Sequence, residues 1–540
     1  MQLSFSEPGL YFYWFRLGGR RAALGEDRNA EFSDSASAYQ ILVYRECFAT
    51  PAWFKGGIMY QIFPDRFFKS GEILVEKGKW LHRDWHETPE FRPNEKGKIL
   101  NNDFFGGNFR GILKKLDYLQ SLHVTVIYLN PIFRAFSNHR YDTGDYMQLD
   151  PMLGSEEDFS ALVSECGKRG IRLILDGVFN HTGDDSRYFN KYGTYDEIGA
   201  YQSKDSKYYS WYNFRHFPDK YDSWWGIDVL PAVNENFPSY IDFITGENGV
   251  LRRWMKYPLG GFRLDVADEL PDEFIAKIRS AVKSANGDAV VIGEVWEDAS
   301  NKIAYSTRRK YFQGEELDSV MNYPLKDAII NFVVSGNTSL LRRTVGMLLD
   351  HYPKCVLDSL MNILGTHDTV RVLTALGGVC AYNKEEMAVL KLSAEQRAVA
   401  TERLKIAAIL LYTFFGVPCI YYGDEIGMEG YSDPFCRKPF AWDLIDEDIL
   451  SHYRWLGELR SRYTVFRDGD YRELYHDDNC IVFERRKGKE AVITVANLGN
   501  NKYTLRFNGV LYNQLSGEQC VDRVDIEPHH IAVYGNISII

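Results

Sequence analysis

The sequence predicts an α/β protein built on a (β/α)8 barrel, the TIM barrel. Apolar, β-prone runs repeatedly end in charged residues, as in GFRLDVADE (261–269) and VVIGEVWE (290–297). Stretches with helical spacing separate such runs, for example 156–170, which a glycine closes. Acidic side chains at the carboxyl ends of strands are typical of the face on which such a barrel carries its chemistry.

Eight runs supply the expected barrel strands. They are 59–67, 125–133, 171–181, the run that starts at Gly261, 290–295, 319–325, 360–368 and 417–425. Helices are expected at 108–121, 156–170, 240–257, 271–285 and 394–415. The strands end in polar clusters, so the sequence predicts that these clusters meet at one rim.

Three further parts are expected around the barrel, which should span 55–464. A short N-terminal β segment covers 1–54, where LYFYWFRL and YQILVYREC alternate as strands do. An irregular stretch rich in Tyr and Trp, 182–236, predicts a small inserted domain after the third strand. Short strands and turns over 465–540 predict an antiparallel β-sandwich at the C-terminus.

Length and charge limit the possible partners. The chain has 540 residues, enough for a large core and for more than one domain. Its net charge of −11 argues against nucleic acid as a partner. No basic run suggests an anionic membrane, and no apolar run is long enough to span a bilayer.

Cysteine usage and the N-terminus favour the cytoplasm. The eight Cys residues are scattered singly, and no Cys/His cluster suggests zinc. MQLSFSEPGL lacks the basic start and apolar core of a signal peptide. This expectation assumes that Met1 is the natural start, since a trimmed N-terminus would hide a leader.

Three strand ends carry the candidate catalytic carboxylates. Arg263 and Asp265 share a strand face, and a guanidinium favours the ionised Asp that a covalent nucleophile requires. Glu294 precedes Trp296 by two residues, and desolvation by an aromatic ring raises a carboxyl pKa as a general acid needs. A structural Arg–Asp ion pair explains the first pattern equally well. A third run that ends in His367 and Asp368 favours the catalytic interpretation.

At these residues the chain resembles the α-amylase superfamily of retaining glycoside hydrolases, over about 56–442. DGVFNH (176–181), GFRLDVADE, GEVWE (293–297) and GTHD (365–368) are similar to its four signature regions. LPAVNE (230–235) is similar to a motif of the neopullulanase, cyclomaltodextrinase and maltogenic amylase branch.

The resemblance implies a role for each candidate residue. Asp265 would be the nucleophile, Glu294 the acid/base, and Asp368 the carboxylate that holds sugar hydroxyls. The implied substrate-binding residues are Tyr141, His181, Arg263, Trp296, His367, Asp433 and Arg437. Simpler interpretations stay open for some of them. Tyr141 is equally an ordinary loop aromatic, Trp296 a residue that packs the barrel rim, and Asp433 with Arg437 a loop salt bridge. Asp176, in the first signature region, is expected to shape the site or simply to orient Arg263.

The implied activity is hydrolysis of α-1,4-glucosidic bonds in maltooligosaccharides, cyclomaltodextrins or pullulan. Cleavage of α-1,6 bonds is left open, because Trp296 recurs in members that accept them. Retention requires Asp265 and Glu294 about 5–5.5 Å apart. The 15% aromatic content suits both a large core and stacking on sugar rings.

Two other functions are considered. A 4-α-glucanotransferase would use the same covalent intermediate with a sugar acceptor. An inactive binding relative is disfavoured, because all of the catalytic carboxylates are present.

Partners and cofactors follow from the same resemblance. An α-glucan oligosaccharide is the expected substrate, with no nucleic acid or membrane partner, no required cofactor and no predicted metal site. Calcium is left open, because KSGEILVEKG (69–78) offers few ligands and Asn108 stands where an Asp is common. The chain is expected to be a monomer or a homodimer, since its N-terminal segment is shorter than the sandwich that builds the dimer in relatives.

Overall fold

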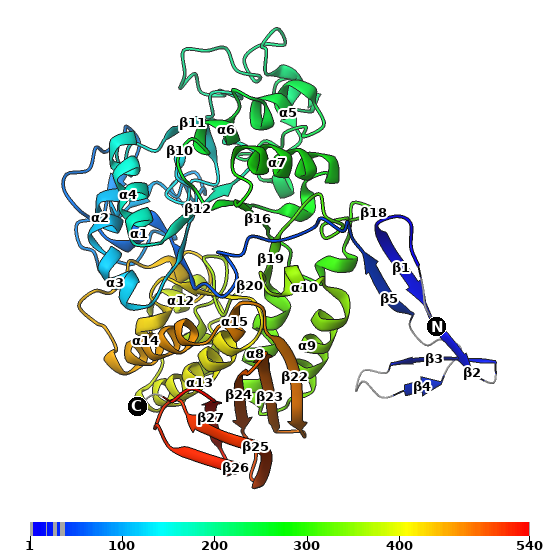
Figure 1. The fold of residues 1–540 in the computed structure, drawn as a ribbon. Coiled ribbons are helices and arrows are strands. Elements are labelled where there is room, and N and C mark those ends of the chain that lie inside the picture. The colour runs from blue at the N-terminus through cyan, green and yellow to red at the C-terminus, as the bar shows by residue number, and fades with distance from the viewer. Residues whose placement is uncertain (1–3, 18, 25–29, 33–37, 539–540) are drawn as a thin grey trace.

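The computed structural model describes residues 4–17, 19–24, 30–32 and 38–538. Eight parallel strands close into a barrel, which confirms the predicted (β/α)8 fold (Figure 1). In chain order they are β6 (Met59–Ile62), β9 (Val126–Leu129), β12 (Arg172–Gly177), β15 (Gly261–Leu264), β16 (Val290–Gly293), β19 (Ser319–Asn322), β20 (Met361–Asn362) and β21 (Val417–Tyr421). Each strand is shorter than the apolar run that predicted it, because the polar end of each run continues into a loop.

Alternation along the strands decides which residues enter the barrel. Met59, Val126, Ile174 and Ile292 belong to a separate apolar cluster inside the barrel. Residues that alternate with them along the strands, such as Leu175, pack instead into the large core shared with the helices, as does Phe262 of β15. Since strand residues alternate between two faces, the inward face continues from Ile174 to Asp176 and from Ile292 to Glu294. The same alternation, with Phe262 outward, turns Arg263 and Asp265 inward.

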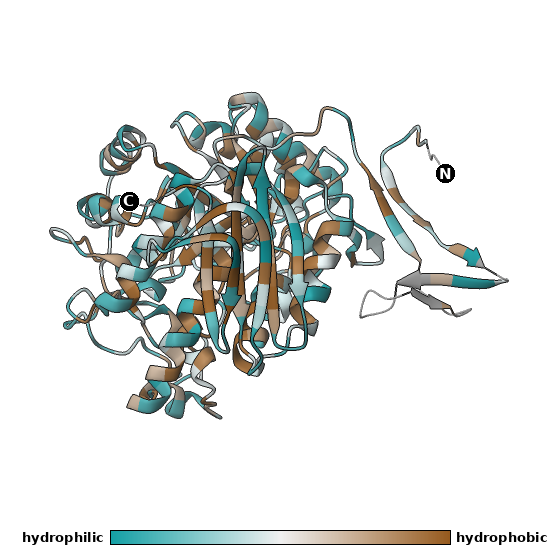
Figure 2. Ribbon diagram, turned by 60° about the horizontal axis from the view of Figure 1, so that its bottom comes forward, coloured by the Kyte–Doolittle hydropathy of each residue, from teal (hydrophilic) through white to brown (hydrophobic). Residues whose placement is uncertain are grey.

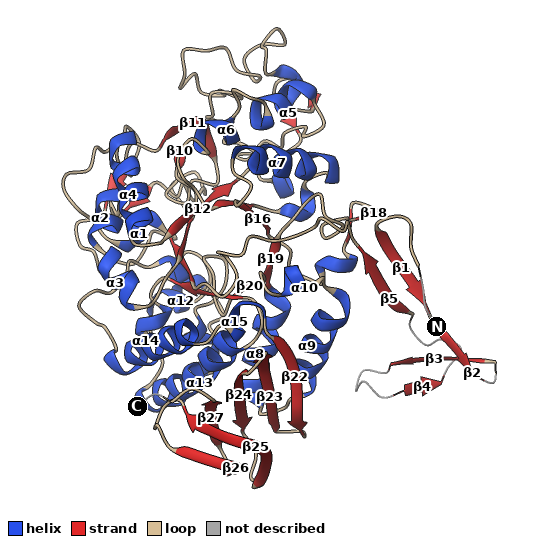
Figure 3. Cartoon of the chain, in the orientation of Figure 1, coloured by secondary structure: helices blue, strands red, loops and turns tan. Residues whose placement is uncertain are grey.

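Helices surround the barrel (Figure 3). They include α2 (Phe109–Lys114), α3 (Leu116–Ser121), α4 (Glu156–Lys168), α5 (Pro238–Thr245), α6 (Val250–Trp254), α7 (Asp272–Ala285), α8 (Tyr323–Ser335), α9 (Ser339–His351), α13 (Ala394–Thr413) and α14 (Glu447–Arg462). The predicted helices 108–121 and 240–257 each divide into two, the second where Gly246 and Gly249 interrupt it. The helices α8, α9 and α14 were not predicted. No helix in the described ranges is long and apolar enough to cross a membrane.

Short elements complete the catalytic region and its insert. They are α1 (Pro64–Phe67), β7 (Trp80–Leu81), β8 (Asp103–Phe104), β10 (Phe133–Ala135), β11 (Thr143–Leu149), β13 (Phe214–His216), β14 (Lys220–Tyr221), β17 (Ile303–Ala304), β18 (Thr307–Arg308), α10 (Lys354–Leu357), α11 (Val372–Gly377), α12 (Lys384–Val389) and α15 (Val465–Asp468). The stretch 182–236 is mostly irregular and folds around aromatic rings, with Phe189 and Phe214 stacked at 5.8 Å. Its status as a separate inserted domain stays a prediction.

The N-terminal segment forms small antiparallel sheets. β1 (Gly9–Tyr13) pairs with β5 (Tyr39–Val43), while β2 (Phe15–Leu17), β3 (Arg20–Leu24) and β4 (Ala30–Phe32) form a three-stranded sheet. Figure 1 shows these strands to one side of the barrel, beside β18. Parts of the predicted segment 1–54 lie outside the described residues.

The C-terminal strands form one sheet, where a sandwich would have two. They are β22 (Asp470–His476), β23 (Cys480–Lys487), β24 (Glu490–Asn497), β25 (Tyr503–Asn513), β26 (Gln519–Ile526) and β27 (His530–Gly535), in the order β22-β23-β24-β27-β25-β26. One face packs on the barrel, where Phe483 stacks on Phe414 of the α13 end at 4.6 Å. Figure 2, in which this sheet comes forward, shows apolar and polar bands along its strands. The predicted boundaries 55–464 and 465–540 stay predictions.

Gly261 offers a test of the barrel register. Its φ is +143°, and a Cβ atom there would lie 1.9 Å from the carbonyl oxygen of Val290 on the neighbouring strand. We expect Gly261→Ala to destabilise the protein by roughly 3 kcal/mol or more, because backbone rather than a movable side chain must shift. The melting temperature, followed by circular dichroism, measures the loss.

Gly167→Ala is the matched control. It lies inside α4, and a Cβ there meets nothing within 4 Å. We expect a gain of about 0.5–1 kcal/mol from the lower chain entropy of Ala. An unchanged melting temperature for Gly261→Ala would contradict the described register.

Candidate active site

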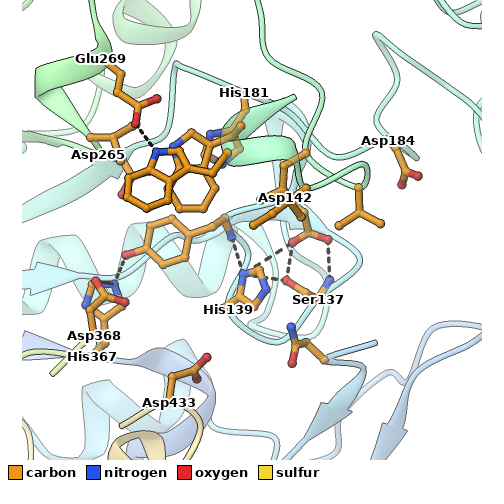
Figure 4. A pocket seen from close by; sticks show the side chains of 18 of the residues that line it. Ser137, His139, Asp142, His181, Asp184, Asp265, Glu269, His367, Asp368 and Asp433 are labelled. Atoms are coloured by element: carbon orange, nitrogen blue, oxygen red, sulfur yellow. Dashed lines mark hydrogen bonds and ion pairs between the residues drawn. The ribbon is translucent and has the colours of Figure 1, made fainter. Parts of the chain in front are cut away.

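The predicted site residues come together at the carboxyl ends of the barrel strands. All of them except Arg263 line one cavity of about 1980 Å³, part of which Figure 4 shows. Asp265, Glu294 and His367 are buried, with exposed fractions of 6%, 5% and 1%. Arg263 lies beneath the cavity floor and is fully buried. Segments distant in the sequence therefore do meet at one rim.

Arg263 joins three carboxylates through its two terminal nitrogens. Nη1 lies 2.7 Å from Oδ1 of Asp265 and 2.8 Å from Oδ1 of Asp176. Nη2 lies 2.9 Å from Oε2 of Glu294. Asp265 and Glu294 therefore contact the same guanidinium. Asp176 contacts it as well, which agrees with the simpler interpretation that Asp176 orients Arg263.

The charge balance of this cluster differs from the sequence-based expectation. We expected Arg263 to keep Asp265 ionised, yet the pKa of Asp265 is raised well above its usual value. Burial is the largest cause, and the charges of Glu294 and Asp176 add to it against Arg263. One guanidinium is shared by three carboxylates, so it cannot neutralise each of them. A closely coupled carboxyl pair then tends to retain a proton, which belongs to the pair rather than to one residue.

Glu294 is fixed by donors on both of its oxygens. The Val266 backbone N–H donates to Oε2 at 2.9 Å, and Trp296 Nε1 donates to Oε1 at 3.2 Å. Val266 has a φ of +40°, an uncommon conformation for a β-branched residue, and so its N–H is aimed at the carboxylate at a cost in strain. Trp296 stacks on Tyr323 at 3.9 Å but remains 46% exposed in the cavity wall.

Tyr141 and His367 form a hydrogen-bonded pair in the cavity lining. The Tyr141 hydroxyl donates to Oδ2 of Asp176 at 2.9 Å and accepts from Asn130 Nδ2 at 2.9 Å. Gln61 Nε2 donates to His367 Nδ1 at 2.9 Å. Since that nitrogen accepts, His367 Nε2 carries the proton and donates to the Tyr141 oxygen at 2.5 Å. The two rings are stacked, with an interplanar angle of 5°.

Asp368 lies between His367 and Arg437. Its oxygens are 3.0 Å from His367 Nε2 and 3.0 Å from Arg437 Nη2. Burial would raise the pKa of Asp368, but His367 and Arg437 outweigh burial and lower it. Arg437 also contacts Asp433 at 2.8 Å, so the salt bridge considered from sequence is present, at the cavity wall.

His181 lines the cavity and has one buried ring nitrogen without a partner. Its Nδ1 lies 3.3 Å from Asn180 Oδ1, whose amide nitrogen donates to Glu235. Because Nδ1 donates, Nε2 is an acceptor, and this buried atom has no partner within the protein. Burial lowers the pKa of His181 to about 4, so the ring is neutral near neutral pH.

Several supporting residues were missed by the sequence analysis. Gln61 and Asn130 orient His367 and Tyr141, and Tyr128 donates to Asp176 at 2.6 Å. The available signal was a polar residue within an otherwise apolar strand, as in MYQIF and VIYLN.

The residue singled out for calcium has another use. Asn108 Oδ1 accepts the Gly111 N–H and caps α2, while its Nδ2 donates to the Ser70 carbonyl. Among the residues that the structure describes, no group of three or more His, Cys, Asp or Glu side chains is arranged to hold a metal ion. Calcium binding stays an untested prediction.

Comparisons with known proteins point to one family. Residues 61–464 match the family model described as "Alpha amylase, catalytic domain". A cyclomaltodextrinase from Geobacillus thermopakistaniensis (strain MAS1) is 34% identical over 91% of this chain and 78% of its own length. A ligand-free cyclic α-maltosyl-(1→6)-maltose hydrolase from Arthrobacter globiformis has a TM-score of 0.74 and 28% identity, covering 90% of this chain and 100% of that one.

Other relatives are much longer. An amylopullulanase from Thermoanaerobacter thermohydrosulfuricus is 36% identical over 90% of this chain, which spans 36% of its length. The chain spans 41% and 28% of two further amylopullulanases, from Thermoanaerobacterium saccharolyticum and Thermoanaerobacterium thermosulfurigenes.

The shared guanidinium predicts a pH-dependent loss of stability. Arg263→Met leaves three buried carboxylates without their cation, at a cost of about 3–5 kcal/mol near neutral pH. The buried carboxyl groups of the folded variant then bind protons that the unfolded chain releases, so a lower pH stabilises the folded variant. The loss of unfolding free energy relative to wild type therefore becomes smaller as the pH falls from ~8 towards ~5.5. Melting temperatures of both proteins across that range measure the effect.

Arg263→Lys is the control, because it keeps the charge but lacks the planar fork that reaches several carboxylates. We expect an intermediate loss of stability. A deficit in Arg263→Met that does not change with pH would contradict the described charge balance.

Proposed function

This chain belongs to the α-amylase family of glycoside hydrolases, and from that premise we propose that it hydrolyses α-1,4-glucosidic bonds with retention of anomeric configuration. The observation that carries the proposal is the pair Asp265 and Glu294, both in contact with Arg263 at the floor of an open cavity. A retaining mechanism requires one nucleophilic carboxylate and one acid/base close together.

In the first step Asp265 attacks the anomeric carbon. A bond forms between the carboxylate oxygen and that carbon while the glycosidic bond breaks, and Glu294 gives its proton to the departing oxygen. The raised pKa of Asp265 and its closeness to Glu294 support one proton being held by the pair. As the step proceeds, the negative charge moves from Asp265 to Glu294, and Arg263 contacts both residues.

In the second step water releases the sugar from the glycosyl-enzyme. Glu294, now ionised, takes a proton from water, and the water oxygen bonds to the anomeric carbon as the bond to Asp265 breaks. The N–H groups of Val266 and Trp296 keep Glu294 in place through both steps.

The remaining residues are assigned to substrate binding. Asp368 has a lowered pKa and stays an acceptor for sugar hydroxyls. His181 Nε2 accepts another hydroxyl, which satisfies its unpaired lone pair. The Tyr141 ring offers an apolar face for the reacting sugar. Asp433 and Arg437 bind the next glucosyl unit on the Asp368 side.

Maltooligosaccharides, cyclomaltodextrins and pullulan are the proposed substrates. The relative covered over 78% of its length is named a cyclomaltodextrinase. We extend the proposal to α-1,6 bonds, since the hydrolase from Arthrobacter globiformis is named for a cyclic substrate with (1→6) links.

We place the protein in the cytoplasm, as a monomer or a homodimer. All eight cysteines are free thiols. Unpaired cysteines are typical of a reducing compartment.

Two variants separate the catalytic roles. Asp265→Asn should lose about 10⁴-fold or more in kcat/KM on maltotetraose and on α-maltosyl fluoride, because both need the nucleophile. Glu294→Gln should lose about 10²–10⁴-fold on maltotetraose. On α-maltosyl fluoride its first step should survive, because fluoride departs without a proton.

Initial rates and the anomer first released, observed by NMR, test the assignment. Asp117→Asn, an exposed carboxylate paired with Arg169 on the barrel exterior, is the control and should match wild type. Release of the inverted anomer, or full activity in Asp265→Asn, would reject the mechanism.

A further inference from the structure

The turn that follows Val266 fixes the peptide in contact with Glu294. The Val266 N–H donates to Glu294, and the chain then forms the 3-10 turn Ala267–Glu269. The Glu269 N–H closes this turn by donating to the Val266 carbonyl at 2.8 Å. Because the left-handed conformation of Val266 costs free energy, it persists only where the surrounding structure holds it in place.

Side chains from a single connection hold this turn. The connection joins β16 to β19, and its Tyr311 hydroxyl donates to Oδ1 of Asp268 at 2.9 Å and lies 3.3 Å from the Ala267 carbonyl oxygen. Arg309 Nη2 donates to the Asp268 carbonyl. Lys302 forms an ion pair with Oδ2 of Asp268 at 3.1 Å. The two peptides directly after Val266 are therefore both bonded to the 302–311 stretch.

Arg309 and Tyr311 are themselves fixed by burial and by further contacts. Their exposed fractions are 6% and 1%. Arg309 Nη1 lies 3.2 Å from Oδ1 of Asp272 at the start of α7, and its backbone N–H donates to the Lys302 carbonyl at 2.9 Å. The Tyr311 ring packs in the large core. Neither Arg309 nor Tyr311 lines the cavity, so an effect of either side chain on a bound sugar has to act through the turn.

We propose that Tyr311 and Arg309 are positioning residues for the acid/base. By holding the turn 267–269, they keep Val266 in its left-handed conformation and keep its N–H on the Glu294 carboxylate. The proposal rests on the proposed function, in which Glu294 protonates the departing sugar. Packing accounts for the ring of Tyr311, but packing alone does not require its hydroxyl to contact the turn beside Val266.

The test removes only the hydroxyl group of Tyr311. In Tyr311→Phe the turn loses two contacts, so Val266 can relax and its N–H can leave Glu294. We expect kcat/KM on maltotetraose to fall about tenfold, because the departing sugar needs a well-placed proton donor. The value on α-maltosyl fluoride should stay at that of wild type, because kcat/KM reports the first step and fluoride departs without a proton.

The pH dependence of the same constant gives a second measurement. A donated N–H favours the ionised form of a carboxyl group, so its loss lets the pair of Asp265 and Glu294 keep its proton to a higher pH. The alkaline limb of kcat/KM on maltotetraose should therefore move up by about 0.5 pH unit in Tyr311→Phe. The substitution leaves Arg263, Asp265 and Asp176 unchanged, which are the charged groups joined to Glu294 through the shared guanidinium.

A double variant tests whether Val266 transmits the effect. Glycine adopts the left-handed conformation without a steric cost, so a glycine at this position needs less support from the turn. In a Val266→Gly background, Tyr311→Phe should lower kcat/KM on maltotetraose by only about twofold or less. Arg309→Lys keeps the charge but lacks the planar fork that reaches both Asp268 and Asp272, and should show an intermediate loss confined to maltotetraose.

Tyr463→Phe is the matched control. The Tyr463 hydroxyl is also bonded to a backbone carbonyl, that of Ile537 at 3.0 Å, and its side chain is 2% exposed at the edge of the C-terminal sheet. It should lower the melting temperature about as much as Tyr311→Phe, with no change in either rate or in the alkaline limb.

Equal losses on both substrates in Tyr311→Phe, or an unchanged rate on maltotetraose, would overturn the positioning role. An alkaline limb that does not move would do the same. Failure of the wild-type protein on both substrates would instead reject the proposed function.

Discussion

One buried guanidinium organises the site. Arg263 contacts Asp176, Asp265 and Glu294, which arrive on three neighbouring strands of the barrel. An unpaired ion of either sign would be expensive at this depth, so the position of each carboxylate depends on the others. Because one positive charge faces three negative ones, the burial of Asp265 and the charges of Glu294 and Asp176 raise the pKa of Asp265 despite Arg263. The barrel supplies the geometry that brings these three carboxylates to one positive charge.

Much of this arrangement follows from sequence. Alternation along the strands places Arg263 and Asp265 on one face, and the barrel topology brings Glu294 and Asp368 to the same rim. The rise in the pKa of Asp265 does not follow, because it depends on how many carboxylates share Arg263. The roles of Gln61 and Asn130 were also hidden, since they act through contacts between strands far apart in the chain.

The wall of the cavity shows a different limit of sequence reasoning. Trp225 comes from the irregular insert and Tyr305 from a hairpin after the fifth barrel strand. Neither lies in a repeated or periodic pattern, and only the folded chain brings both to the cavity that Asp265 lines. The barrel strands can thus be predicted from local patterning, whereas the cavity wall is built from connections whose partners are set by tertiary packing.

Val266 combines a strained backbone with a hydrogen bond to the proposed acid/base, Glu294. A β-branched residue with a φ of +40° is an awkward choice, and a less strained backbone would make the molecule sturdier. That relaxation would turn the peptide N–H away from Glu294. With Glu294 in its proposed role, a variant that relaxed this backbone would gain thermal stability and lose turnover rate.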